Sequence, residues 1–207
     1  MIKETALHYL GYDHQIISDE INQLLDECIE EVKKRSTFKA ISATFTYKDN
    51  EIIELQLPLD SIDTKIYFEG CDHIMVTAYT LGIEIERYLR LLSKTDMTKG
   101  LIMDSVASAY LEFKADEYDQ NIHEPRTYRF APGYGDLSIE INKVLYHALD
   151  LSKYLGITLT DTGLFLPQKT MLCLIGIGKE NLKKSCGSCI KIKDCFLRKE
   201  NKRCWID

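Results

Sequence analysis

Apolar residues recur every three to four positions in several stretches of the chain. In residues 18–35 this spacing is accompanied by a serine that can cap the first turn, by acidic residues early and by basic residues late, as the helix dipole favours. The same helical spacing continues in residues 83–94, 98–124 and 138–156. We therefore predict four helices, the last of which ends at a glycine.

Other stretches have the patterns of β-strands. Residues 38–59 alternate apolar and polar positions on both sides of Lys48-Asp49-Asn50, which predicts a β-hairpin. Residues 73–82 form a short apolar run typical of a buried strand, and residues 161–178 read as a turn followed by another apolar strand. The order of elements lacks βαβ regularity, so the pattern predicts an α+β fold with a twisted, largely antiparallel sheet and packed helices.

Composition and charge narrow the functional classes. The 207 residues carry a formal net charge of −6, which argues against nonspecific binding to nucleic acid or to an anionic membrane. No apolar run approaches the roughly 20 residues needed to span a bilayer. The N-terminus has charged residues and histidines where a signal peptide would be apolar. We therefore expect a cytoplasmic protein with reduced thiols.

A change in composition near Gly178 divides the chain into an acidic body, residues 1–178, and a basic tail, residues 179–207. Residues 179–203 contain nine Lys or Arg against three Asp or Glu. The tail has a C-x2-C-x5-C-x8-C pattern that could hold zinc or an iron–sulfur cluster, or could consist of reactive or simply flexible thiols. Its four candidate metal ligands are Cys186, Cys189, Cys195 and Cys204. The other three cysteines, which stand in apolar or amphipathic segments, are expected to be small buried hydrophobes.

The segment 127–138, TYRFAPGYGDLS, combines several features of a ligand-binding loop. Pro132 and Gly133 suit the central positions of a type II turn, and Arg129 could bind a carboxylate in a bidentate manner. Tyr134 offers an aromatic face to a planar base or a cation, and glycine backbone permits close approach of a ligand. The alternative is a connecting loop with a solvated arginine and a tyrosine that covers the core.

The predicted helix 98–124 carries polar side chains on one face. Asp104, Ser108 and Glu112 follow one another at four-residue intervals and could stabilise a positive ligand, although a solvated acidic stripe is the ordinary interpretation. The acidic residues that follow, at 116, 117 and 119, are expected to be exposed. The five histidines form no metal-binding pair and the chain has no G-x-S-x-G nucleophile motif, so the sequence does not support hydrolysis.

Taken together, the segments resemble the activation domain of cobalamin-dependent methionine synthase, particularly its stand-alone relatives. The resemblance spans most of the chain up to about residue 178, and its most specific element is the R-x-x-P-G-Y core. It is carried by LHYLGYD (7–13), FEGCDHIMVTAYTLG (68–82), DSVASAYLE (104–112), RFAPGYGD (129–136) and LPQKTMLCLIGIG (166–178).

This resemblance implies an α+β fold that binds extended S-adenosylmethionine on a shallow surface. It assigns Arg129 to the methionyl carboxylate, the backbone of Ala131 and Gly133 to the adenine end, and Tyr134 to the signature tyrosine. The family also has an acidic contact on the preceding helix, where Ser108 stands in this chain. Glu112 and Asp104 are therefore the candidates for that contact. The family's ligand-contacting tyrosine on the late strand has no clear counterpart here.

The implied function is that of a separate reactivation subunit in methionine biosynthesis. It would support reductive methylation of cob(II)alamin on a partner in trans, which would be a methionine synthase or another corrinoid methyltransferase. An electron donor such as flavodoxin or ferredoxin would supply the electron. Cobalamin would be carried by the partner, and whether the chain is itself an enzyme stays open. The alternatives are a module that senses S-adenosylmethionine or docks a corrinoid protein, and an electron-transfer protein that works through a cluster held by the four cysteines of its tail.

Overall fold

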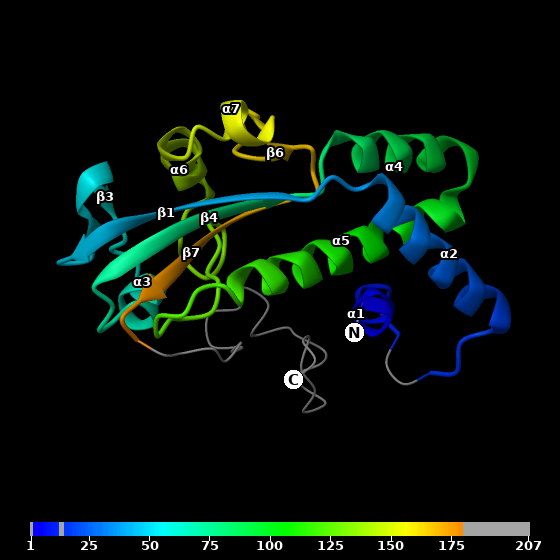
Figure 1. The fold of residues 1–207 in the computed structure, drawn as a ribbon, viewed down its shortest axis with the longest axis horizontal. Helices are drawn as coiled ribbons and strands as arrows, with labels where there is room; N and C mark the ends of the chain where they lie inside the picture. Colours follow the sequence, from blue (N-terminus) through cyan, green and yellow to red (C-terminus); the bar gives the residue numbers. More distant parts are fainter. Residues whose placement is uncertain (1, 13–14, 180–207) are drawn as a thin grey trace.

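The computed structural model of the chain describes residues 2–12 and 15–179. Its centre is a five-stranded antiparallel sheet in the order β3-β2-β1-β4-β7 (Figure 1). A separate two-stranded sheet pairs β5 with β6. The strands of the large sheet are β1 (Lys39–Lys48), β2 (Glu51–Ile52), β3 (Leu57–Pro58), β4 (His73–Thr80) and β7 (Thr170–Ile177), and those of the small sheet are β5 (Thr158–Leu159) and β6 (Phe165–Leu166). The predicted α+β class with an antiparallel sheet is confirmed.

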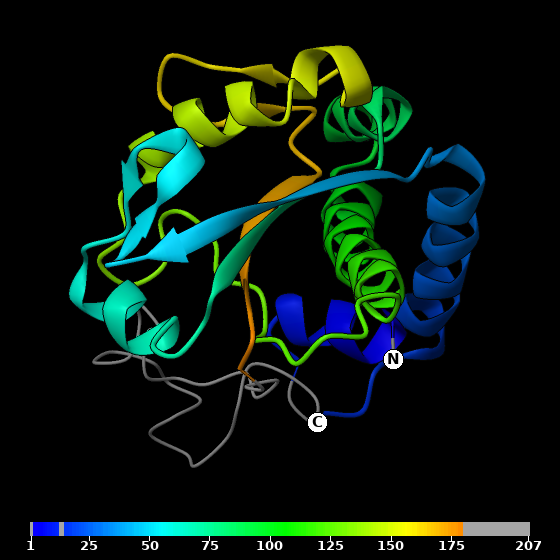
Figure 2. The same ribbon diagram turned by 60° about the vertical axis from the view of Figure 1, so that its left-hand side comes forward.

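Helices cover both faces of this sheet. Figures 1 and 2 show α6 and α7 on one side and α5, with α1 and α2 beyond it, on the other. The helices are α1 (Ile2–Tyr9), α2 (Asp19–Arg35), α3 (Ile62–Tyr67), α4 (Ile83–Thr95), α5 (Met97–Asp119), α6 (Asn142–Ala148) and α7 (Leu151–Leu155), with 3-10 turns η1 (Ile53–Leu55) and η2 (Ile139–Ile141). Within the described ranges, no helix is long and apolar enough to cross a membrane.

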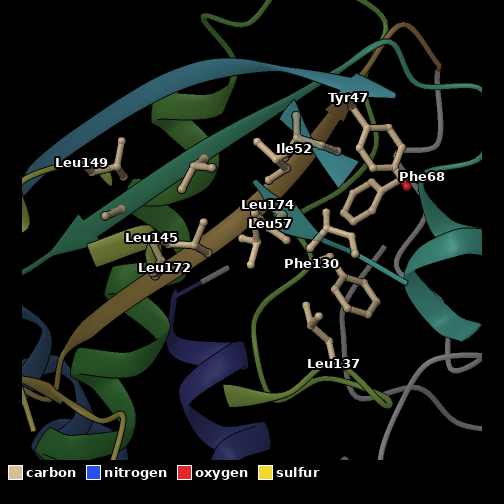
Figure 3. Packing of buried hydrophobic residues seen from close by; sticks show 14 of the residues in the cluster. Tyr47, Ile52, Leu57, Phe68, Phe130, Leu137, Leu145, Leu149, Leu172 and Leu174 are labelled. Atoms are coloured by element: carbon tan, nitrogen blue, oxygen red, sulfur yellow. The ribbon is translucent and has the colours of Figure 1, made fainter. Parts of the chain in front are cut away.

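Alternation along the central strands separates two hydrophobic clusters. On one face, Val76 of β4 and Leu174 of β7 pack with side chains from α6 and α7 and with Phe130 (Figure 3). On the other face, Tyr79 of β4 and Cys173 of β7 pack against α1, α2, α4 and α5. Successive residues of a strand point to opposite faces, so one central sheet supplies both clusters.

Local sequence explains most of the element boundaries. The Oγ of Ser18 accepts a hydrogen bond from the N–H of Ile21 and caps α2, as predicted. Asp49 and Asn50 both have positive φ, the conformation that the tight turn between β1 and β2 requires, so the predicted hairpin is confirmed at its turn. Its second arm is shorter than the pattern indicated, because η1 interrupts the chain after β2.

The single helix predicted over residues 138–156 is wrong in its continuity. The segment forms η2, α6 and α7, and the break falls at Asp150, whose backbone is left-handed with φ +47°. A left-handed residue cannot continue a right-handed helix. The apolar spacing persists across the break because α6 and α7 place Leu145 and Leu151 in the same hydrophobic cluster.

Candidate functional site

The segment that leads into the predicted loop runs beside β7 at the edge of the sheet. Two isolated antiparallel bridges join Arg126 to Ile177 and Phe130 to Leu174. Phe130 and Leu174 exchange both backbone hydrogen bonds, at 2.9 and 2.8 Å. This pairing buries the Phe130 ring in the cluster with α6 and α7, so the neighbouring Arg129 side chain lies on the α5 side of the sheet.

The predicted turn is present immediately after this edge segment. The N–H of Tyr134 donates to the carbonyl of Ala131 at 3.0 Å, and Gly133 has φ +89°, as the third position of a type II turn requires. A Cβ built on Gly133 would have Ile139 as its nearest neighbour at 4.0 Å, so the backbone is open there. Tyr134 is 53% exposed, and its ring packs against that of Phe130 in a T-shaped arrangement.

Asp136 ties this turn to α3. Its carboxylate accepts hydrogen bonds from the backbone N–H groups of Ile62 and Asp63 at 2.8 and 3.1 Å. In return, the N–H of Asp136 donates to the carboxylate of Asp63 at 3.2 Å. Burial raises the pKa of Asp136, but hydrogen bonds from Ser61 and from the backbone outweigh burial and lower it below its usual range. The charged form of Asp136 therefore fixes the turn.

Arg129 lies in a buried cluster of charges on the inner side of α5. Its guanidinium donates to Glu112 at 2.8 Å, to Asp116 at 2.5 Å and to Asp119 at 2.5 Å. The side chain is only 3% exposed and also contacts the hydroxyl of Tyr128. The alternative of a solvated arginine is therefore wrong: three carboxylates of one helix surround one cation.

Electrostatics keep the guanidinium of Arg129 charged. Burial lowers the pKa of Arg129, but attraction from the carboxylates of Glu112 and Asp116 outweighs burial and raises it above its ordinary value. Burial raises the pKa of Asp119, although Arg129 and a hydrogen bond from the Tyr79 hydroxyl act in the opposite direction. The arginine thus compensates carboxylates that would otherwise be costly to bury.

A second ionic contact lies on the same helix toward its N-terminus. Lys169, which precedes β7, donates from its ammonium to the Oγ of Ser108 and forms an ion pair with Asp104, each at 2.8 Å. The side chain of Asp104 is 53% exposed, whereas that of Lys169 is 11% exposed. Residues 104, 108 and 112 therefore lie on one face of α5, as predicted. Lys169 contacts one end of this face and Arg129 contacts the other.

Four of the predicted site residues lie in one segment: Arg129, Ala131, Gly133 and Tyr134. A fifth, Glu112, forms an ion pair with Arg129. Asp104 lies apart from this segment, on Lys169. Whether these residues bind a ligand stays a prediction. The expectation that residues 116 and 119 are merely exposed is wrong, because both bind Arg129 and Asp119 is almost fully buried. Their four- and seven-residue spacing from Glu112 was the signal that could have found them.

The four tail cysteines predicted as metal ligands lie outside the described residues, as does nearly all of the tail. Among residues 2–12 and 15–179, no group of three or more potential ligands could hold a metal ion. Cys28, Cys71 and Cys173 are buried, as expected. Burial raises the pKa of Cys28 to about 11 and also raises that of Cys71 and of Cys173, so these thiols stay protonated at neutral pH.

The chain was compared with family models, curated proteins and solved structures. No protein-family model matches the sequence, and no match is found among curated proteins. Among solved structures, the chain is similar to the MetH reactivation domain bound to AdoHcy, with a TM-score of 0.55 and 13% sequence identity. The similarity covers 92% of this chain and 75% of that one. At this identity it is the fold that is shared: the chain has the α+β fold of the MetH reactivation domain.

Proposed function

We propose that the chain binds S-adenosylmethionine and acts as a reactivation domain for a corrinoid protein. The observation that carries this proposal is the type II turn of residues 131–134, which has an open glycine backbone and an exposed tyrosine. The R-x-x-P-G-Y sequence and the likeness to a reactivation domain bound to AdoHcy support it. AdoHcy is the product that S-adenosylmethionine leaves when it gives up its methyl group.

The edge of the sheet fits the nucleoside end of such a ligand. Phe130 directs both of its backbone groups toward Leu174, so those of the next residue, Ala131, point away from β7. Gly133 leaves room beside them, and the Tyr134 ring offers an aromatic face. The carbonyl of Ala131 accepts from Tyr134 and the N–H of Gly133 donates to Leu137. The N–H of Ala131 and the carbonyl of Gly133 would therefore hold the adenosine, while Tyr134 packs against it.

The carboxylates of α5 fit the cationic end. Three carboxylates of α5 bind the single guanidinium of Arg129, and the side chains of Glu112 and Asp116 are partly exposed. This surplus of negative charge favours a ligand that carries a sulfonium and an ammonium. The protein would orient the sulfonium methyl outward, toward the partner.

Bound S-adenosylmethionine would supply the methyl group that, with one electron from a donor such as flavodoxin or ferredoxin, converts cob(II)alamin on the partner to methylcobalamin. The partner would be a methionine synthase or another corrinoid protein. In this reaction the described residues would bind and orient S-adenosylmethionine and balance its charge, while the bonds that form and break belong to the cofactors.

Two measurements test this function. Isothermal titration of the full chain with S-adenosylmethionine should show saturable binding, and the absence of binding would contradict the proposal. Methylcobalamin formation should then be followed in a mixture of this chain, a corrinoid protein, reductant and S-adenosylmethionine. Binding without stimulation of methylcobalamin formation would leave the sensing or docking module as the function.

A further inference from the structure

Lys169 is a buried lysine whose ammonium is only partly satisfied. It lies directly before β7, and its side chain crosses to α5. An ammonium has three N–H donors. Among the described residues, its partners are one hydroxyl, of Ser108, and one carboxylate, of Asp104. Lysines are rarely buried without a compensating role, so this residue is a candidate for binding an anionic group.

The charge balance around Lys169 differs from that around Arg129. Three carboxylates already face the single guanidinium of Arg129, and they would repel a further carboxylate brought to it. One carboxylate faces the single ammonium of Lys169. If the Asp104 side chain moves aside, a net positive charge remains at Lys169. The carboxylate of a ligand can then take the place of the Asp104 carboxylate.

Exchange of partners is also easier at Lys169. Asp104 is more than half exposed, so water can solvate its carboxylate after it leaves the ammonium. Asp119 is almost fully buried, and removing its contact with Arg129 would leave a carboxylate uncompensated in the interior. The ion pair of Lys169 with Asp104 can therefore separate when a ligand binds, whereas Arg129 keeps its three carboxylate partners.

The spacing of the two contacts along α5 matches an amino-acid zwitterion. Ser108 and Glu112 are four residues apart, so their side chains are neighbours on one helix face. The ammonium of Lys169 lies on Ser108, and the carboxylate of Glu112 is partly exposed one turn further along. Of the two Glu112 oxygens, only Oε2 has a hydrogen-bond partner within the described part of the chain. The buried ammonium of Lys169 and the partly exposed carboxylate of Glu112 therefore lie along one face of α5, at positions one helical turn apart.

We propose that Lys169, and not Arg129, binds the carboxylate of the methionyl end of S-adenosylmethionine, while Glu112 accepts its ammonium. This inference rests on the proposed function, since it names the residues that hold one end of the same ligand. Arg129 is then a positioning residue that fixes Glu112 and the edge segment.

The test compares S-adenosylmethionine with its decarboxylated analogue, which has the same nucleoside, sulfonium and amine but no carboxylate. Isothermal titration is made on the full chain and on Lys169→Met, which keeps the length of the side chain. We expect the variant to bind S-adenosylmethionine about ten- to a hundredfold more weakly, as expected for loss of a charge-assisted contact. It should bind the analogue as tightly as the wild-type chain does.

Controls separate this inference from folding and from the proposed function. Lys34→Met removes an exposed lysine of α2 and should change neither affinity, and Lys169→Arg should recover most of the binding of S-adenosylmethionine. A folded Lys169→Met chain that prefers S-adenosylmethionine to the analogue as strongly as wild type overturns the assignment. Failure of the wild-type chain to bind either ligand overturns the proposed function itself.

A second variant keeps the inference testable if Lys169→Met does not fold. Asp104→Asn removes the carboxylate that competes for the Lys169 ammonium. We therefore expect it to bind S-adenosylmethionine several-fold more tightly, with no change for the decarboxylated analogue. Weaker binding of both ligands by Asp104→Asn would mean that Asp104 contacts the cationic end, and it would overturn the assignment.

Discussion

Arg129 shows that a residue singled out by the sequence can have an environment that the sequence does not predict. The R-x-x-P-G-Y pattern singles it out, but the pattern is silent on the three carboxylates that α5 presents to it. Burial of Asp119 depends on a cation and on the hydroxyl of Tyr79, which come from segments 10 and 40 residues away in the chain. Such a cluster is a product of tertiary packing, and helical spacing alone could only suggest that its acidic members share a face.

We predict that Arg129→Gln strongly destabilises the fold. The substitution leaves three carboxylates without their cation, and breaking a buried ion pair in this way costs about 3–5 kcal/mol. Urea unfolding followed by circular dichroism should show this loss. Arg87→Gln is the matched control, because its pair with Glu84 is exposed and should contribute at most about 0.5 kcal/mol. Equal, small effects of both substitutions would contradict the buried cluster.

Gly133→Ala tests the turn itself. A non-glycine residue in the left-handed region costs about 1–2 kcal/mol, and the new methyl group would stand on the open backbone where the ligand is expected. Gly156→Ala is the control, since Gly156 also has positive φ and open space around it but ends α7. Both should lose similar stability in thermal unfolding, whereas only Gly133→Ala should weaken S-adenosylmethionine binding in titration. Equal binding by both variants would place the ligand elsewhere.

At the scale of elements, the sequence predicts what local patterns determine. Strand alternation in β1, the apolar runs of β4 and β7, and the capped helix α2 are all found where the pattern places them. The break at Asp150 could not be predicted, because the apolar spacing continues across it: Leu145 of α6 and Leu151 of α7 pack in the same cluster. Helix α1 is too short for its spacing to be distinctive.

The contact of Asp136 with α3 should make stability depend on pH. The pKa of the Asp136 carboxyl is lower in the folded chain than in the unfolded chain, where it is about 3.9. Its contribution to stability is therefore fully present above about pH 3.9 and is lost as the pH falls through the pKa of the folded state. Asp136→Ala should therefore cost about 1 kcal/mol at neutral pH, as expected for loss of a helix cap. This difference should shrink below about pH 4.

Unfolding by urea at pH 7 and at pH 3 measures this difference. Glu124→Ala, at an exposed position outside the helices, is the control and should show little difference at either pH. A constant penalty for Asp136→Ala at both values would mean that the charge of Asp136 does not hold the turn.

At the scale of the whole molecule, the central sheet joins two hydrophobic clusters, and each cluster contains at least one buried cysteine. Cys71 lies in the cluster with α6 and α7, and Cys28 and Cys173 lie in the cluster with α5. Since burial raises the pKa of all three thiols, they should resist iodoacetamide at pH 8 until the chain unfolds. Peptide mass spectrometry of labelled protein, before and after addition of denaturant, identifies each site. Rapid native labelling of Cys173 would contradict its packing against α5.

The fixed position of the turn has a consequence for how the nucleoside would be recognised. Residues 126–136 lie between β7 and α3, joined by backbone bridges to one and by a reciprocal aspartate contact to the other. Folding has therefore already removed conformational freedom worth about 1–2 kcal/mol per residue. A synthetic peptide spanning 126–138 would contain every group of the loop, yet it would have to lose this freedom on contact with the ligand, and we expect it to have no measurable affinity.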